Sequence, residues 1–79
     1  MKYIAHQNNH IVIFDDGQLH ADVADKMRWT KEKITGAGFV YGLGQGDREK
    51  VKTEGESVSL GIRSNPDDAD IIKRDIWGY

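Results

Sequence analysis

The sequence predicts an α+β domain, a mostly antiparallel β-sheet with two α-helices. Runs rich in β-branched and aromatic residues, typical of strands, occupy residues 2–5 and 11–14 and return after residue 35. Apolar residues at helical spacing mark residues 19–29 and the segment that follows residue 65. The expected order is strand, strand, helix, strand, strand, helix, and the last four residues fit either packing on the sheet or a short final strand.

Length and composition limit the classes of protein that fit. The chain has 79 residues, which we interpret as a single domain spanning residues 1–79. It has no cysteine, which excludes disulfides and thiolate zinc sites and favours a cytoplasmic protein. The formal net charge of -2 argues against nonspecific nucleic-acid binding. The longest wholly apolar run, residues 11–14, is too short for a membrane span or a signal peptide, so we expect neither a membrane segment nor a targeting segment. We also expect a monomer.

The first two strands are expected to form a hairpin. Tyr3 and Ile4 favour the first strand, and the second strand is the Ile-Val-Ile-Phe run at residues 11–14. Between them lies Asn8-Asn9, a pair suited to a turn. We therefore predict antiparallel pairing through this turn.

The first helix is predicted over about residues 19–29. Leu19, Val23 and Met27 recur every four residues, and Ala24 widens this stripe into an apolar face available for burial. A carboxylate in the first turn, such as Asp22, complements the partial positive charge of a helix N-terminus.

A second hairpin is expected in the middle of the chain. Residues 35–42 mix glycine with strand-forming residues, residues 42–47 resemble a flexible connection, and residues 51–54 fit the return strand. Glycine inside a strand marks a bulge or a close backbone approach, so Gly36 and Gly38 serve either packing or a ligand.

The second helix has the clearest start in the sequence. Asn65 is suited to the cap, and Pro66 to the first helical position. Ala69, Ile72 and Ile76 supply the apolar side of this helix.

His20 is the main candidate for chemistry because it lies at the entry to the first helix. Free backbone N–H groups at a helix start attract anions, phosphate above all, and an imidazole there can attack or deprotonate what they bind. The alternative is that His20 is a solvated surface residue without a chemical role.

Other motifs give weaker indications. The glycines between residues 36 and 46 match neither nucleotide-binding fingerprint, so a glycine-rich hairpin is the simpler interpretation. His6, His10 and His20 lack the ligand spacing of a metal site, and we expect no metal. Ser57 is not flanked as in the Gly-x-Ser-x-Gly elbow of hydrolases, so nothing selects it as a nucleophile.

The turn at Ser57-Val58-Ser59 is more informative in combination with His20. Its small residues can present backbone N–H groups as an anion nest. If the two segments meet, the imidazole faces a phosphate-sized cradle, and Lys2 at the start of the first strand can supply a neutralising charge.

Six segments match a known family in order over nearly the whole chain: Lys2-Tyr3-Ile4, Leu19-His20-Ala21-Asp22-Val23-Ala24-Asp25-Lys26, Gly36-Ala37-Gly38, Gly55-Glu56-Ser57-Val58-Ser59-Leu60-Gly61, Ile72-Lys73 and Trp77-Gly78-Tyr79. Together they resemble the Janus family, whose best-known members are the small eukaryotic protein-histidine phosphatases. The second segment is similar to the family's Tyr-His-Ala-Asp-Ile-x-Asp helix start, and the fourth to its Gly-Tyr-Ser-x-Ala-x-Gly turn.

The resemblance implies a role for each matching residue. His20 matches the catalytic histidine, which acts as nucleophile or general base when phosphate is removed from phosphohistidine. The implied phosphate-binding residues are Lys2, Ala21 through its backbone N–H, Ser57, Val58 and Ser59. The partner is then a phosphorylated protein or a small phosphorylated molecule, and no metal or cofactor is required.

Two departures from the family pattern leave several functions open. Phe39 stands where the family has an arginine that helps bind phosphate, and Ser59 stands where it has alanine. Loss of a bidentate phosphate donor removes a strong interaction. We therefore consider a phosphatase acting on phosphorylated histidine or lysine, a noncatalytic module that binds phosphate with the same cradle, and an interaction protein that keeps only the fold.

Overall fold

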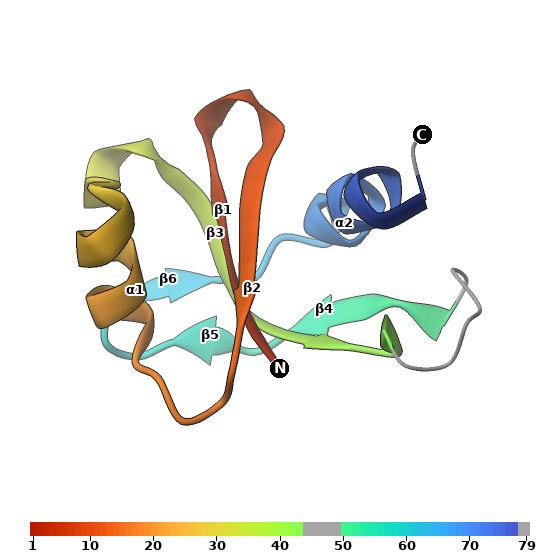
Figure 1. Cartoon of the computed structure of the whole chain (residues 1–79), viewed down its shortest axis with the longest axis horizontal. Coiled ribbons are helices and arrows are strands. Elements are labelled where there is room, and N and C mark those ends of the chain that lie inside the picture. Colours follow the sequence, from red (N-terminus) through yellow and green to blue (C-terminus); the bar gives the residue numbers. More distant parts are fainter. Residues whose placement is uncertain (44–49, 78–79) are drawn as a thin grey trace.

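The computed structural model describes residues 1–43 and 50–77 of the chain (Figure 1). The helices and strands in chain order are β1 (Lys2–His6), β2 (His10–Phe14), α1 (His20–Met27), β3 (Ile34–Tyr41), β4 (Lys52–Glu54), β5 (Glu56–Ser57), β6 (Ile62–Arg63) and α2 (Asp67–Trp77). Short 3-10 turns lie at Gln7–Asn9 and Lys31–Lys33. The α+β class predicted from the sequence is confirmed, because the structure combines an antiparallel sheet with two α-helices.

The main sheet has the strand order β2-β1-β3-β4, and each neighbouring pair is antiparallel. The predicted hairpin of β1 and β2 is confirmed, with residues 2–6 paired to residues 10–14. It turns through Asn8 and Asn9, whose φ angles are 68° and 63°. Asparagine tolerates this left-handed region better than most residues, which explains why an Asn-Asn pair makes the turn.

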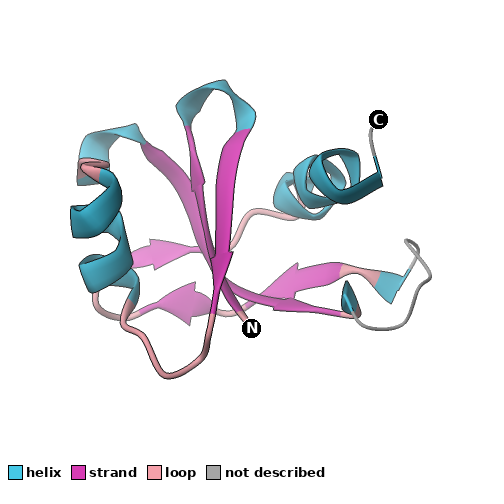
Figure 2. Cartoon of the chain, in the orientation of Figure 1, coloured by secondary structure: helices cyan, strands magenta, loops and turns pink. Residues whose placement is uncertain are grey.

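Both faces of the sheet are covered (Figures 1 and 2). The helix α1 lies against one face and α2 against the other. Side chains alternate along β1, so Ile4 packs with Val23 of α1, whereas Tyr3 and Ala5 pack in the cluster that contains Ile72 of α2. All three β1 residues are fully buried because this strand lies between two layers.

A second, two-stranded sheet was not anticipated from the sequence. The strands β5 and β6 pair antiparallel, with Glu56 opposite Arg63 and Ser57 opposite Ile62. Ile62 and Leu60 pack against the core cluster on the α1 side of the main sheet. The small residues expected to form only a turn therefore also form a hairpin, whose tip lies near α1.

The burial of α1 differs from the prediction. Leu19 and Met27 are 55% and 45% exposed, so the expected stripe does not hold at its two ends. The buried residues of this helix are His20, Val23 and Ala24. Leu19 is the N-cap residue, with an extended backbone conformation, and so lies just outside the helix.

The helix α2 begins as expected. The Asp67 N–H donates to Asn65 Oδ1 at 3.0 Å, which confirms the asparagine cap. Ile72 is fully buried, but Ile76 is 47% exposed, contrary to the prediction for this residue. The helix continues to Trp77, so a last strand does not begin at Ile76.

Close packing explains the predicted glycine positions on β3. A Cβ on Gly36 would overlap the side chain of Asp68, and one on Gly38 would lie 2.7 Å from the carbonyl oxygen of Glu54. Asp68 is held there by the Tyr3 hydroxyl, which donates to its Oδ2 at 2.6 Å. Gly36 therefore serves packing between β3 and α2.

Two expectations fall partly or wholly outside the described residues: most of the glycine-rich connection at 42–47 and the final Gly78-Tyr79. Among the residues described, no helix has the length and apolar character needed to cross a membrane.

Candidate functional site

His20 is buried at the first position of α1. It is 4% exposed, and its ring makes T-shaped contacts with two aromatic rings. The ring centroids are 5.3 Å from Phe14 at an interplanar angle of 81° and 6.0 Å from Phe39 at 85°. The alternative of a solvated surface histidine therefore does not hold.

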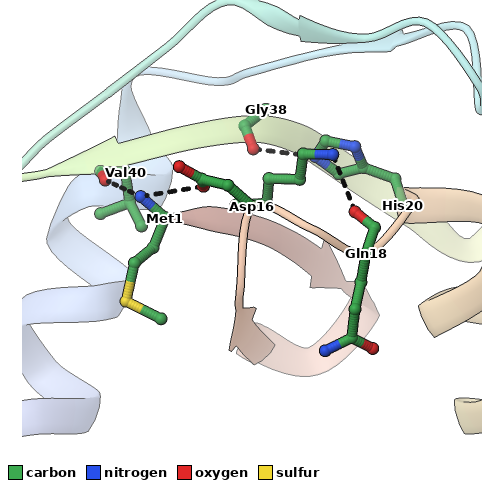
Figure 3. Close-up of polar contacts among 7 residues, drawn as sticks. Met1, Asp16, Gln18, His20, Gly38 and Val40 are labelled. Atoms are coloured by element: carbon green, nitrogen blue, oxygen red, sulfur yellow. Dashed lines mark hydrogen bonds and ion pairs between the residues drawn. The ribbon is translucent and has the colours of Figure 1, made fainter.

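One nitrogen of the His20 ring is fixed by the backbone of β3. His20 Nε2 lies 2.9 Å from the carbonyl oxygen of Gly38 (Figure 3). A carbonyl oxygen only accepts, so Nε2 carries the proton of this hydrogen bond. The other nitrogen, Nδ1, has no hydrogen-bond partner among the described residues.

The surroundings of His20 favour its neutral form. Burial lowers the pKa of the imidazole, the hydrogen bond to Gly38 opposes this in part, and the positive charge of Lys2 lowers the pKa further. The net result is a pKa below the ordinary value for histidine. A neutral ring protonated on Nε2 leaves a lone pair on Nδ1, which can act as a base or a nucleophile.

Lys2 is tied to the segment that leads into α1. Its Nζ donates to the carbonyl oxygen of Gln18 at 2.7 Å. In the same region the Met1 amino group donates to the Val40 carbonyl at 3.3 Å and forms an ion pair with Asp16 at 3.3 Å (Figure 3). These contacts hold the start of β1 against the loop before the helix and place the ammonium group of Lys2 beside His20.

A hollow of about 190 Å³ opens at this point, which we call the His20 hollow. Its lining residues come from β1, the start of α1, β3 and the β5–β6 hairpin, and they are Lys2, Leu19, His20, Phe39, Glu56, Val58 and Ser59. The structure thus brings together four of the six predicted site residues, namely the histidine, the lysine, Val58 and Ser59.

Register explains why Phe39 lies in this hollow. Lys2 of β1 is the Cα partner of Phe39 on β3 and of Phe14 on β2. Partners across an antiparallel sheet point to the same face, so these side chains form one row beneath α1. The position where the family has arginine therefore does face the site.

Ser57 and Ala21, the other two predicted site residues, do not line the hollow. Ser57 is fully buried, and its hydroxyl oxygen accepts the Leu60 N–H at 3.1 Å while its carbonyl oxygen accepts the Gly61 N–H at 2.7 Å. These bonds hold the turn together and use the backbone N–H groups of the two residues that follow Ser59. The Ala21 N–H donates to Ser59 Oγ at 3.2 Å.

The two serine hydroxyls form a short chain toward the hollow. Ser57 Oγ lies 3.4 Å from Ser59 Oγ, and either hydroxyl can donate to the other. Ser59 Oγ also accepts the Ala21 N–H, so its proton is free to donate when Ser57 is the donor of the serine pair. Ser59 lines the hollow and Ala21 does not, so the N–H group of Ala21 is linked to the hollow through the Ser59 hydroxyl.

Sequence reasoning missed Glu56 as a lining residue. In the structure Ser57 is buried and Glu56 exposed, so their side chains leave β5 on opposite sides. A strand of two residues is too short to show this alternation in the sequence, so no sequence signal pointed to Glu56.

The other candidate groups do not join the site. His6 and His10 are cross-strand partners with ring centroids 6.3 Å apart, and His6 stacks on Trp29 at 4.7 Å. Trp29 follows the C-terminal end of α1, whereas His20 begins that helix. Within the part of the chain that the structure describes, no group of three or more metal-ligating side chains comes together.

A larger depression lies beside the His20 hollow. It measures about 490 Å³ and is lined by Gly17, Gln18, Leu19, Asp22, Asp25 and Lys26. Its lining has two carboxylates, from Asp22 and Asp25, and one ammonium group, from Lys26, so it is unfavourable for an anion. No histidine is among these lining residues. The smaller hollow is therefore the better candidate for the site.

Comparisons with protein-family models, with curated proteins and with solved structures each found no match.

Proposed function

We propose that this protein removes phosphate from a phosphorylated nitrogen, that of a histidine or lysine side chain, with His20 as nucleophile or general base. The observation that carries the proposal is a buried imidazole whose Nδ1 has no partner among the described residues, at a hollow that it shares with Lys2. The resemblance to protein-histidine phosphatases in the residues around His20 supports the same reaction.

The net reaction is hydrolysis of a P–N bond. As nucleophile, Nδ1 forms a bond to phosphorus while the P–N bond of the substrate breaks and the leaving nitrogen takes up a proton from solvent water. Water then attacks the phosphorylated imidazole, and the P–Nδ1 bond breaks to give inorganic phosphate and the free ring. As general base, Nδ1 instead takes a proton from the attacking water, and that proton is later returned to the leaving nitrogen or the solvent.

Lys2 and Ser59 are the donors for the phosphoryl group. The Lys2 ammonium has three N–H donors, and one is used by the Gln18 carbonyl. With Ser57 as the donor of the serine pair, the Ser59 hydroxyl donates its own proton into the same hollow. This set is weaker than one with an arginine, and a P–N bond is labile enough for a modest site to act on it.

The proposal includes the setting of the protein. We propose a cytoplasmic monomer whose partner is a phosphorylated protein or a small phosphorylated molecule, and whose reaction requires neither a metal nor another cofactor. In this reaction His20 is the nucleophile or base, Lys2 and Ser59 bind the phosphoryl group, and solvent supplies the attacking water.

A specific observation favours a second candidate, a noncatalytic module that binds a phosphorylated partner. Phe39 lines the hollow where an arginine would bind phosphate, and Ser59 occupies the N–H of Ala21. A site with fewer donors stabilises a transition state less well. Such a module binds phosphate and leaves the P–N bond intact.

Phosphate release from a phosphohistidine peptide in the presence of EDTA tests the proposal. We expect release by the protein, a loss of at least about a hundredfold in His20→Ala, and full activity in His10→Ala, which alters a surface histidine. Amide NMR spectra establish that each variant is folded. Equal release by His20→Ala would remove the histidine from the mechanism, and no release by any variant, with phosphate-dependent shifts at Ala21 and Ser59, would favour the binding module.

A further inference from the structure

Glu56 is a carboxylate at the His20 hollow that the proposed reaction does not use. It begins β5, is exposed, and lines the hollow together with Lys2 and the histidine. Its cross-strand partner is Arg63, but the ion pairs among the described residues are Met1 with Asp16 and Lys73 with Asp70. The negative charge of Glu56 is therefore not neutralised by a described cation.

This carboxylate is unfavourable for phosphate alone. A phosphate dianion in the hollow meets one positive charge, that of Lys2, and one negative charge, that of Glu56. Like charges close together repel, and a carboxylate has only acceptors to offer. The hollow is better suited to a ligand that brings a positive charge or an N–H donor along with its phosphoryl group.

We propose that Glu56 is the specificity-determining residue of the site, and that it selects ligands whose phosphoryl group is carried by a positively charged nitrogen group, either a protonated phosphoimidazole ring or a protonated phosphoramidate nitrogen. The phosphoryl oxygens face Lys2 and Ser59, and the charged nitrogen group faces Glu56. The inference rests on the proposed function for the position of the phosphoryl group, and it adds the chemical class of the ligand: a zwitterionic phosphoramidate in preference to a phosphate monoester or inorganic phosphate.

The two charges of the hollow come from different elements of the fold. Lys2 is held on the α1 side by the Gln18 carbonyl, whereas Glu56 is contributed by β5 of the separate hairpin. The apolar residues Leu19, Phe39 and Val58 complete the lining. Opposite charges supplied by different elements can bind the two ends of a zwitterion at once, which confers specificity.

Two small probes of the same size test the inference. Phosphoramidate carries a protonated nitrogen beside its phosphoryl group at neutral pH, and inorganic phosphate does not. Each is titrated at low salt into the wild-type protein, Glu56→Gln and Glu54→Gln, and the amide NMR signals of Ala21 and Ser59 report binding. Glu54→Gln is the matched control, because it removes the same charge two residues away from a side chain that does not line the hollow.

We expect the wild-type protein to bind phosphoramidate about threefold more tightly than phosphate, the size expected of a solvent-exposed charge pair. In Glu56→Gln this preference disappears, because phosphoramidate binds less tightly and phosphate more tightly. In Glu54→Gln it remains. The inference is overturned if Glu56→Gln keeps the wild-type ratio, if both variants change it equally, or if neither probe binds.

Failure of this inference differs from failure of the proposed function. If the protein releases phosphate through His20 but its preference for phosphoramidate over phosphate does not depend on Glu56, only the role of Glu56 is contradicted. If the protein releases no phosphate but its ligand preference depends on Glu56, the proposed phosphatase activity is contradicted and the recognition of zwitterionic ligands is supported.

Discussion

The His20 imidazole donates from Nε2 to the carbonyl oxygen of Gly38, across 2.9 Å, and this bond links the start of α1 to β3. It fixes the tautomer of the neutral ring and its orientation, and so determines which nitrogen is left for chemistry. The proposed reaction depends on this relationship, because only a ring fixed through Nε2 leaves a basic Nδ1.

The ionisation of His20 should respond to Lys2. Burial first, and then the Lys2 charge, lower the pKa of the imidazole, so Lys2→Met should raise it while keeping the apolar stem of the side chain. NMR titration of the ring protons measures both values. Lys52→Met, on β4, is the control, and an equal rise in both variants would show that net charge and not proximity is responsible.

The same pKa shift makes stability depend on pH. The folded protein has a lower His20 pKa than the unfolded chain, so the unfolded state binds more protons between the two values, and stability rises with pH across this window. The stabilisation is present above the ordinary histidine pKa of about 6.5 and is lost as the pH falls through the folded value. Urea denaturation should show this loss in the wild-type protein and a smaller one in His20→Gln; identical curves would assign the dependence to other groups.

Gly36→Ala should destabilise the fold strongly. The new Cβ would overlap the side chain of Asp68, which is 1% exposed and hydrogen-bonded to Tyr3. Overpacking of a buried contact typically costs about 1–3 kcal/mol of unfolding free energy. Gly17→Ala is the matched control, because nothing lies within 4 Å of the Cβ that it adds. Urea denaturation measures both, and equal stability of the two variants would mean that β3 and α2 pack less closely than described.

Phe39→Arg should strengthen the binding of inorganic phosphate. Phe39 lines the hollow in register with Lys2, so a guanidinium group there adds charged donors to the site. One charge-assisted hydrogen bond is worth about 1.5 kcal/mol, or roughly a tenfold gain in affinity. Tyr41→Arg makes a similar change on the same strand outside the hollow. Titration by NMR distinguishes them, and a gain of the same size in Tyr41→Arg would count against placing residue 39 at the site.

Local patterns predicted much of the fold. The Asn8-Asn9 turn, the cap at Asn65 and the strand character of β1 to β4 depend on neighbouring residues, and the structure has them where they were expected. The burial of Leu19 and Met27 was predicted wrongly. Helical spacing shows which residues share a face of the helix, but it does not show where the helix ends or how it is rotated about its axis against the sheet. Tertiary packing decides those, and it turned His20 toward the sheet.

The site was predictable only in part. The residue types at His20, Lys2 and the Ser57–Ser59 turn indicated an anion site, and the structure places Lys2, Val58 and Ser59 at one hollow with the histidine. The bond between Ala21 and Ser59 depends on contact between α1 and the tip of the β5–β6 hairpin. The position of Glu56 depends on that hairpin as well, and two-residue strands are too short for a periodic pattern to reveal.

The pH dependence of phosphate release, measured beside the NMR titration of His20 in the same protein, tests the central claim most directly. If neutral His20 performs the reaction, kcat/KM rises with pH through the His20 pKa, and Lys2→Met moves the rate profile and the titration upward together. A rate that stays constant across the titration of His20, or that changes at a pH unrelated to it, would contradict the claim that the histidine carries the reaction.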